Sequence, residues 1–173
     1  MNTPADSLLD TVTLTAINPA LKLLPIAMDS PAARVQLLAT GLQESSFTTR
    51  RQAGNGPARS LWQFEQGSQT NGGGIWGVYL HDSSRYWLKQ LCDARSCPFV
   101  PASIYSSIET DDVLAAGLAR LLIFADRGPL PALGDANAAW DLYAKRTWLP
   151  GKPRPADWPG NYVRALRFVR GSV

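Results

Sequence analysis

Apolar residues in this chain recur mainly at helical spacing, and the clearest helical pattern begins at residue 31. Ser30 supplies a capping hydroxyl, and Pro31 is a residue that favours the first helical position. The apolar residues that follow fall on one face of a helix: Val35, Leu38, Ala39 and Leu42. We therefore predict a helix that starts at Pro31 and has Glu44 in or just beyond its last turn.

The other periodic segments predict a mainly α fold. Further helices are expected after Asp157 and at residues 5–14, 18–24, 82–91, 102–107, 112–124 and 136–146. The 112–124 segment is apolar nearly all round, which predicts a central buried helix. Residues 48–79, with three consecutive glycines at 72–74, predict an irregular, loop-rich region with a short extended piece, of the kind that lines a substrate groove. No alternating strand pattern of useful length is present in the sequence.

The length of 173 residues is that of one ordinary domain. We expect a single domain over residues 1–173, with packing helices in 1–29, a core that holds the candidate site in 30–148, and a C-terminal loop and helix in 149–173. No apolar run approaches the roughly 20 residues that cross a bilayer, so no membrane span is expected. Asp6 and Asp10 precede the first basic residue, which is the reverse of a secretory signal peptide.

The net charge and the histidine and cysteine content limit which ligands we expect. The formal net charge of +3 predicts mild attraction to polyanions, and anionic cell-wall polymers fit this charge. No helix has a dense basic face, so nucleic acid is not expected as a partner. No metal and no organic cofactor is expected, because His81 is the only histidine and structural zinc normally takes four ligands. The spacing of Cys92 and Cys97 is compatible with a small disulfide, and reduced thiols are the equal alternative.

Glu44 is the residue best suited to carry chemistry. The negative end of the helix dipole and the apolar neighbours Leu42 and Phe47 disfavour its ionised form, so its pKa is expected to rise toward neutrality. Glutamates tuned in this way protonate leaving groups in glycoside cleavage. The structural alternative is an ion pair of Glu44 with Arg50 or Arg51, which would lower that pKa.

Two ordered elements contain this glutamate and its candidate partners. The first is Gln43-Glu44-Ser45-Ser46-Phe47, the second is Leu61-Trp62-Gln63-Phe64, and Glu44 and Gln63 are 19 positions apart. The pair resembles the lysozyme-like lytic transglycosylases and the related goose-type lysozymes, in which a helix ends in Glu-Ser-x-Phe and a Gly-Leu-Met-Gln element follows at a similar separation. A third family element, Ala-Tyr-Asn, corresponds to Ala139-Trp140-Asp141 or takes its tyrosine from Tyr143. The chain departs from the family with Ser60 for glycine, Trp62 for methionine, and no asparagine-glycine tail.

The resemblance implies a lysozyme-like domain that cuts peptidoglycan glycan strands between N-acetylmuramic acid and N-acetylglucosamine. Glu44 would be the general acid, and Ser45 and Gln63 would hold the sugar or the carboxylate by hydrogen bonds. In the transglycosylases the substrate assists, and the same glutamate later takes a proton from a sugar hydroxyl to give a 1,6-anhydro product. The alternative is a hydrolytic muramidase, which would need Glu65 or Asp141 as a second carboxylate.

Aromatic residues near these elements are candidate sugar-binding groups, because pyranose rings stack on aromatic faces. The candidates are Trp62, Trp76, Trp140 and Tyr143. The structural alternative is that most of the six tryptophans pack in the core, where large aromatic side chains contribute much of the burial. We expect core packing for the others: Trp87, Trp148 and Trp158.

The small size, the single module and the missing signal peptide resemble bacteriophage enzymes of cell-wall degradation. Such a protein would act at the periplasmic cell wall, as an endolysin made in the infected host cell or as a component of the virion. The implied partners are peptidoglycan glycan strands and, for a virion component, other virion or tail proteins. The alternative from another class is a structural virion or tail protein that keeps the fold without activity.

Overall fold

The structure is a computed structural model that describes residues 6–149 and 151–172. Within these residues helices are joined by turns and loops, and β pairing is limited to isolated bridges, so the prediction of a mainly α fold is confirmed. In chain order the α-helices are α1 (Ser7–Val12), α2 (Asn18–Lys22), α3 (Pro31–Ser45), α4 (Gly74–Leu80), α5 (Asp82–Ala94), α6 (Pro101–Ser107), α7 (Asp112–Ala125), α8 (Ala136–Asp141) and α9 (Trp158–Gly171). The short π-helices are η1 (Thr13–Ile17) and η4 (Leu142–Thr147), and the short 3₁₀ helices are η2 (Ile26–Met28) and η3 (Ala53–Asn55).

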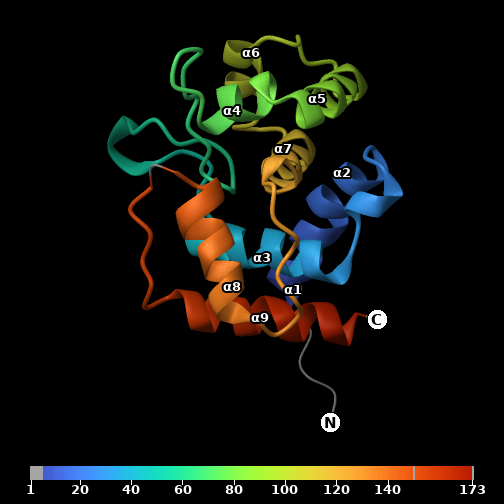
Figure 1. Ribbon diagram of the computed structural model, residues 1–173, viewed down its shortest axis with the longest axis vertical. Coiled ribbons are helices and arrows are strands. Elements are labelled where there is room, and N and C mark those ends of the chain that lie inside the picture. Colours follow the sequence, from blue (N-terminus) through green and yellow to red (C-terminus); the bar gives the residue numbers. More distant parts are fainter. Residues whose placement is uncertain (1–5, 150, 173) are drawn as a thin grey trace.

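Helices α3 and α7 lie in the middle of the molecule (Figure 1). Helices α4, α5 and α6 form a group at one end, whereas α8 and α9 lie at the other end, where α9 packs along α3. The α1–η1–α2 segment contacts α7 from the side. None of the helices in the described part of the chain is long and apolar enough to cross a membrane.

The helix starts at Ser30, Asp111 and Asp135 follow the capping signals in the sequence. Each of these side chains accepts a hydrogen bond from the backbone N–H three residues later, at 2.9 to 3.2 Å. The predicted starts of α3, α7 and α8 are therefore confirmed. Asp157 precedes α9 as predicted, but its carboxylate makes no capping bond and instead accepts from Arg154 Nε at 2.7 Å.

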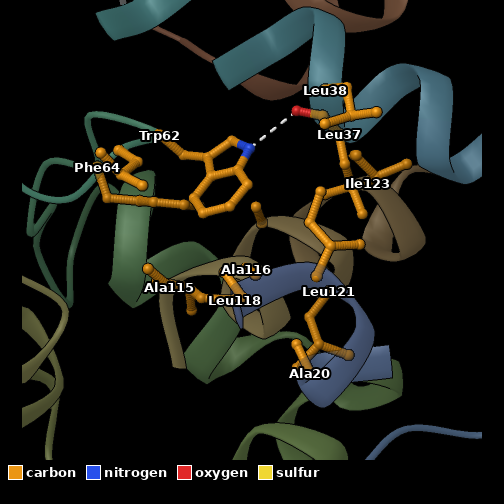
Figure 2. Close-up of a cluster of buried hydrophobic side chains, with 14 of the residues drawn as sticks. Ala20, Leu37, Leu38, Trp62, Phe64, Ala115, Ala116, Leu118, Leu121 and Ile123 are labelled. Atoms are coloured by element: carbon orange, nitrogen blue, oxygen red, sulfur yellow. Dashed lines mark hydrogen bonds between the residues drawn. The ribbon is translucent and has the colours of Figure 1, made fainter. Parts of the chain in front are cut away.

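Helix α7 is the central buried helix that its apolar sequence predicts, with Leu114, Leu118 and Leu121 fully buried. Figure 2 shows the core beside it, where the Trp62 indole comes from the loop after α3. Trp62 Nε1 donates to the carbonyl of Leu37 in α3 at 2.9 Å, which satisfies the polar atom of a side chain with no exposed surface. The bond anchors this loop to the core.

The sequence predicts a loop through residue 79, and this is wrong for residues 74–79. They belong to α4, whose Ile75 and Val78 are buried in the core. The glycines signalled a loop, but Gly73 and Gly74 form a tight turn with positive φ values of 74° and 50°. A Cβ on Gly74 would lie 2.0 Å from the Glu65 carbonyl oxygen, so glycine here permits close backbone packing.

The predicted helices 5–14 and 18–24 are a second correction, because no break separates them. Helices α1, η1 and α2 follow one another without interruption through residues 7–22, and Ala5 lies outside the described residues. Asn18 and Pro19 signalled a new helix start. The wider turns of η1 instead accommodate the proline, which cannot donate a helical hydrogen bond.

The end of α3 is fixed by a contact between Phe47 and Gly41. Ser46 and Phe47 have positive φ values of 53° and 56°, which end the helix and turn the chain back on it. The buried Phe47 ring lies against Gly41, where a Cβ would be 2.1 Å from the ring atom Cε1. The same ring packs edge-on against Trp62, with 5.5 Å between centroids. Glycine inside α3 is therefore required by space, despite its low helix propensity.

We predict that Gly41→Ala destabilises the protein by about 1 to 3 kcal/mol in urea unfolding, because the added methyl group displaces the Phe47 ring. Gly160→Ala is the matched control. Gly160 also lies in a helix, but a Cβ there meets nothing within 4 Å. This control should gain about 0.5 to 1 kcal/mol from helix propensity. Equal gains in both variants would contradict the packing account.

Candidate active site

Glu44 lies in the last turn of α3 and is mostly buried. Burial, the largest cause, raises the pKa of its carboxyl group from the ordinary value of 4.5 to about 7. A hydrogen bond from Tyr143 and the positive charge of Arg154 both act to lower the pKa, and burial outweighs them. The rise that the sequence predicts is confirmed, and its main cause is loss of water around the carboxyl group.

Tyr143 is the direct partner of this carboxyl group. Its phenol oxygen donates to Glu44 Oε1 at 2.5 Å. Tyr143 lies in the π-helix η4 and is 3% exposed, and burial together with the nearby Glu44 raises the pKa of its phenol. The phenol therefore stays protonated and serves as a hydrogen-bond donor to Glu44.

Gln43, the residue before Glu44, makes hydrogen bonds to the loop that follows η4. Gln43 Nε2 donates to the Arg154 carbonyl at 2.8 Å, and Arg154 Nη2 donates back to the Gln43 carbonyl at 3.0 Å. Asn161 Nδ2 of α9 donates to Gln43 Oε1 at 2.9 Å. We call these three residues the Gln43 latch. It fixes the end of α3 against α9 and keeps the Arg154 guanidinium near Glu44.

The predicted alternative, an ion pair of Glu44 with Arg50 or Arg51, is wrong. Arg50 makes a two-point contact with Asp112, at 3.0 and 2.5 Å, and Arg51 lies 3.3 Å from Glu109. Both arginines are thus paired with other acidic groups. Within the described residues Glu44 makes no salt bridge, and its side chain accepts a hydrogen bond from the neutral phenol of Tyr143.

Three aromatic rings lie against Tyr143: Trp140, Trp148 and Trp158. We call these four residues, Tyr143 included, the Tyr143 cluster. Trp158 stacks parallel to Tyr143, with 5.1 Å between centroids and 4° between planes. Trp140 and Trp148 lie 5.6 and 6.1 Å from Tyr143 and are partly exposed, whereas Trp158 is buried. The cluster fixes the direction of the phenol and places partly exposed aromatic surface next to the Glu44 partner.

Ser45 follows Glu44 in the chain and Gln63 lies in the loop after α3, and the side chains of both make hydrogen bonds to backbone carbonyls. Ser45 Oγ donates to the Leu61 carbonyl at 2.6 Å, which ties the end of α3 to the loop after it. Gln63 Nε2 donates to the carbonyls of Ser60 at 2.7 Å and Thr49 at 3.2 Å. Both side chains are partly exposed. In this structure their hydrogen bonds shape the loop.

Ser60 occupies a position where glycine would be expected. Its φ of 72° lies in the left-handed region, and its Oγ accepts a hydrogen bond from the Trp62 N–H at 3.2 Å. This bond supports the strained turn.

The three tryptophans that the sequence predicts as sugar-binding residues differ in exposure and in their neighbours. Trp62 has no exposed surface and belongs to the core. Trp76, on α4, is partly exposed and packs on Tyr79, with 5.4 Å between centroids. Trp140, on α8, is partly exposed and lies in the Tyr143 cluster. Of the three, Trp140 is the one whose ring contacts the partner of Glu44.

The two candidate second carboxylates lie on exposed positions. Asp141 lies 2.6 Å from Lys145 one helical turn later, and both side chains are more than half exposed. Glu65 is exposed in the loop between Phe64 and α4, and its backbone carbonyl accepts a hydrogen bond from the Ile75 N–H at 3.1 Å. Among the described residues, neither carboxylate makes a hydrogen bond to Glu44 or Tyr143.

The described residues hold no group of three or more histidine, cysteine or acidic side chains that could bind a metal ion. Cys92 and Cys97 are both buried and are free thiols in this structure. Burial, followed by the influence of Cys97, raises the pKa of the Cys92 thiol to about 12. Trp87 and Trp148 pack partly buried against the core, and Trp158 is buried in it, as the sequence predicts.

Arg154 and the role of Gln43 are not predictable from the sequence. Their contacts join segments 111 residues apart, so no local pattern marks them. Arg154 lies among prolines in a segment that reads only as a stiff loop. The sequence predicts core packing for Trp148. In the structure its Nε1 also donates to the Trp62 carbonyl at 2.9 Å, which joins the two loops beside the site.

Comparisons with known proteins return no match to this chain among protein-family models, curated sequences or solved structures. The family resemblance therefore rests on the ordered motif residues alone.

The raised pKa of Glu44 predicts that the protein loses stability as pH rises from about 4.5 to about 7. Below this window Glu44 is protonated in both states, whereas within it the unfolded chain releases the proton and the folded state keeps it. Glu44→Gln removes this titration. The variant should gain up to about 3 kcal/mol relative to wild type between pH 4 and pH 8, measured by urea unfolding.

Glu65→Gln is the control for this experiment, because it removes an exposed glutamate and leaves Glu44 in place. It should keep the difference in stability between pH 4 and pH 8 that wild type shows. A Glu44→Gln variant whose stability relative to wild type is the same at both pH values would show that Glu44 titrates normally.

Proposed function

We propose that this protein cleaves the glycan strands of peptidoglycan with Glu44 as general acid and base, in the manner of a lytic transglycosylase. One observation carries the proposal. Glu44 is a mostly buried carboxyl group with a pKa of about 7, held by a neutral phenol and free of an ion pair with arginine in the described residues. Such a group is protonated in about half of the molecules at neutral pH and can give and take a proton.

The hydrogen bond from Tyr143 gives the two carboxyl oxygens of Glu44 different roles, one as acceptor and the other as carrier of the acid proton. Oε1 accepts the phenol hydrogen, so the proton of the neutral acid resides on Oε2. Transfer of that proton to the bridging oxygen of a glycosidic bond is worth about 10²- to 10⁴-fold in rate. The bond between this oxygen and the anomeric carbon then breaks, and the leaving sugar keeps the electron pair as a neutral alcohol.

After proton transfer Glu44 is a carboxylate, and two neighbours stabilise its charge. The Tyr143 phenol still donates to it, and the Arg154 guanidinium attracts it, since both act to lower the pKa. The carboxylate can then accept a proton from the 6-hydroxyl of the sugar as that oxygen closes on the anomeric carbon. This gives an anhydro product and restores the acid, so one glutamate serves both steps.

The surroundings of the other acids favour single-glutamate chemistry over hydrolysis. Asp141 is paired with Lys145 on an exposed helix face, and Glu65 is exposed on its loop. An exposed carboxylate paired with a lysine is a poor nucleophile or base for a reaction at a buried acid. The partly exposed rings of Trp140 and Trp148 next to Tyr143 supply apolar surface of the kind on which pyranose rings stack.

The proposal includes a lysozyme-like arrangement of the mainly α fold and a bacteriophage setting. The protein would meet its substrate at the periplasmic cell wall, as an endolysin or as a virion component. The competing proposal is a structural virion or tail protein. The two differ in one measurable property, which is whether the purified protein releases fragments from peptidoglycan.

We predict that Glu44→Gln abolishes the clearing of purified peptidoglycan while leaving the circular dichroism spectrum unchanged. Glutamine keeps the shape and the acceptor for Tyr143 but cannot supply a proton. Glu65→Gln should keep most of the activity. Loss of activity in Glu65→Gln with a native spectrum would favour the hydrolytic mechanism, and a wild-type protein that clears nothing would favour the structural role.

Mass spectrometry of the fragments released by the wild type distinguishes the two reactions. We expect 1,6-anhydro ends, each with a mass lower by one water than the hydrolytic product. Reducing ends alone would overturn the transglycosylase mechanism and leave the acid role of Glu44 intact.

The pH profile provides a further prediction. The value of kcat/KM should fall as pH rises through about 7, because the first step needs protonated Glu44. Tyr143→Phe removes a hydrogen bond that lowers this pKa, so the fall should move to higher pH. Tyr162→Phe is the control, since Tyr162 contacts Trp158 of the cluster and its hydroxyl accepts from the Gly134 N–H at 3.0 Å. A Tyr143→Phe profile that coincides with the control would contradict the proposal.

A further inference from the structure

The two cysteines of the chain lie at the C-terminal end of α5. Cys92 is in the last turn of this helix, and Cys97 is in the turn that follows it. Both are free thiols in this structure, with Cys92 fully buried and Cys97 7% exposed. Helix α5 belongs to the group of helices at the end of the molecule away from α8 and α9 (Figure 1). The two thiols are therefore separate from the candidate active site.

A hydrogen-bonded cap brings the two cysteines together. Ser96 has a left-handed backbone with a φ of 53°, and its N–H donates to the Asp93 carbonyl at 3.2 Å. One residue later, the Cys97 N–H donates to the Cys92 carbonyl at 2.9 Å. These two bonds form a Schellman motif, in which the residue after the left-handed one commonly packs on the residue five positions before it. In this chain both of those positions are cysteine.

The surroundings of the two thiols agree with this close approach. Burial, the largest cause, raises the pKa of the Cys92 thiol to about 12, and the neighbouring Cys97 thiol raises it further. A disulfide needs Cα atoms about 4.4 to 6.8 Å apart and side chains that point toward each other. The shared backbone hydrogen bond and the contact between the thiols favour this arrangement. A bond between the sulfurs would therefore close on the cap as it is already folded.

The same cap lies against the start of the central helix α7. Arg95, the last residue of the cap before Ser96, donates from Nε to Asp111 Oδ2 at 2.8 Å. Asp111 is the N-cap of α7 and accepts from the Leu114 N–H at 2.9 Å. A covalent bond across the end of α5 would thus hold the turn that contacts the N-terminus of α7.

We propose that Cys92 and Cys97 form a reversible disulfide across the α5 cap when the protein meets a low-molecular-weight disulfide such as oxidised glutathione. The protein loses two electrons and two protons, and the oxidant gains them as its sulfur–sulfur bond breaks into two thiols. A dithiol reductant reverses the reaction. This site does not depend on the activity proposed for Glu44.

The exposure of the two residues sets the order of the steps. Cys97 retains some exposed surface, whereas Cys92 has none. The Cys97 thiolate therefore attacks the oxidant first, forms a mixed disulfide and releases one glutathione. Cys92 then attacks the Cys97 sulfur and releases the second glutathione. Because both thiols are largely covered, we expect the reaction to take minutes to hours.

The test incubates the reduced wild-type protein with oxidised glutathione in the absence of denaturant. Mass spectrometry after thiol alkylation should show a protein that is lighter by two hydrogen atoms and carries no alkyl group. Dithiothreitol should restore both thiols. The melting temperature of the oxidised form should be about 3 to 8 °C higher than that of the reduced form, because the cross-link restricts the unfolded chain. Two unreacted thiols, a stable mixed disulfide, or a lower melting temperature on oxidation would overturn the proposal.

Two variants test the order of attack, with circular dichroism to confirm that each is folded. Cys92→Ala should stop at the mixed disulfide of Cys97 with glutathione. Cys97→Ala should react at least tenfold more slowly, because the remaining thiol is fully buried and has a raised pKa. Equal rates in the two variants would contradict the role of Cys97 as the first thiol to react.

Discussion

The hydrogen bond from Tyr143 to Glu44 is the interaction on which the candidate site depends. It joins residues 99 positions apart and gives a mostly buried carboxyl group a neutral partner. An arginine or lysine in the same place would hold Glu44 as a carboxylate, whereas no partner at all would leave a buried polar group unpaired. A phenol satisfies the oxygen while leaving the proton equilibrium close to neutral pH.

The rest of the structure keeps this pair in place. The Gln43 latch holds the end of α3 to the loop after η4 and to α9 through three hydrogen bonds. The Tyr143 cluster directs the phenol, and the Trp148 indole bonds to the backbone of the loop that contains Gln63. Burying a titratable carboxyl group reduces stability at neutral pH, and such a cost is typical of functional sites.

Local patterns in the sequence predict the features that depend on a few neighbouring residues. The cap at Ser30, the buried α7 and the rise in the pKa of Glu44 follow from helix signals and apolar neighbours. Features set by distant contacts are not predictable in this way. Glycines 72–74 indicate a loop, but packing of Ile75 and Val78 in the core stabilises a helix after them. The position of Arg154 is fixed by its hydrogen bonds with Gln43, which is distant in the sequence.

The most direct test of the central claim is a ¹³C NMR titration of the Glu44 carboxyl group, assigned by its absence in Glu44→Gln. The account predicts an apparent pKa of about 7 in the folded protein, well above the ordinary value of 4.5. Titration of this carbon near 4.5 would contradict it, because Glu44 would then be an ordinary carboxylate at neutral pH with no proton to give.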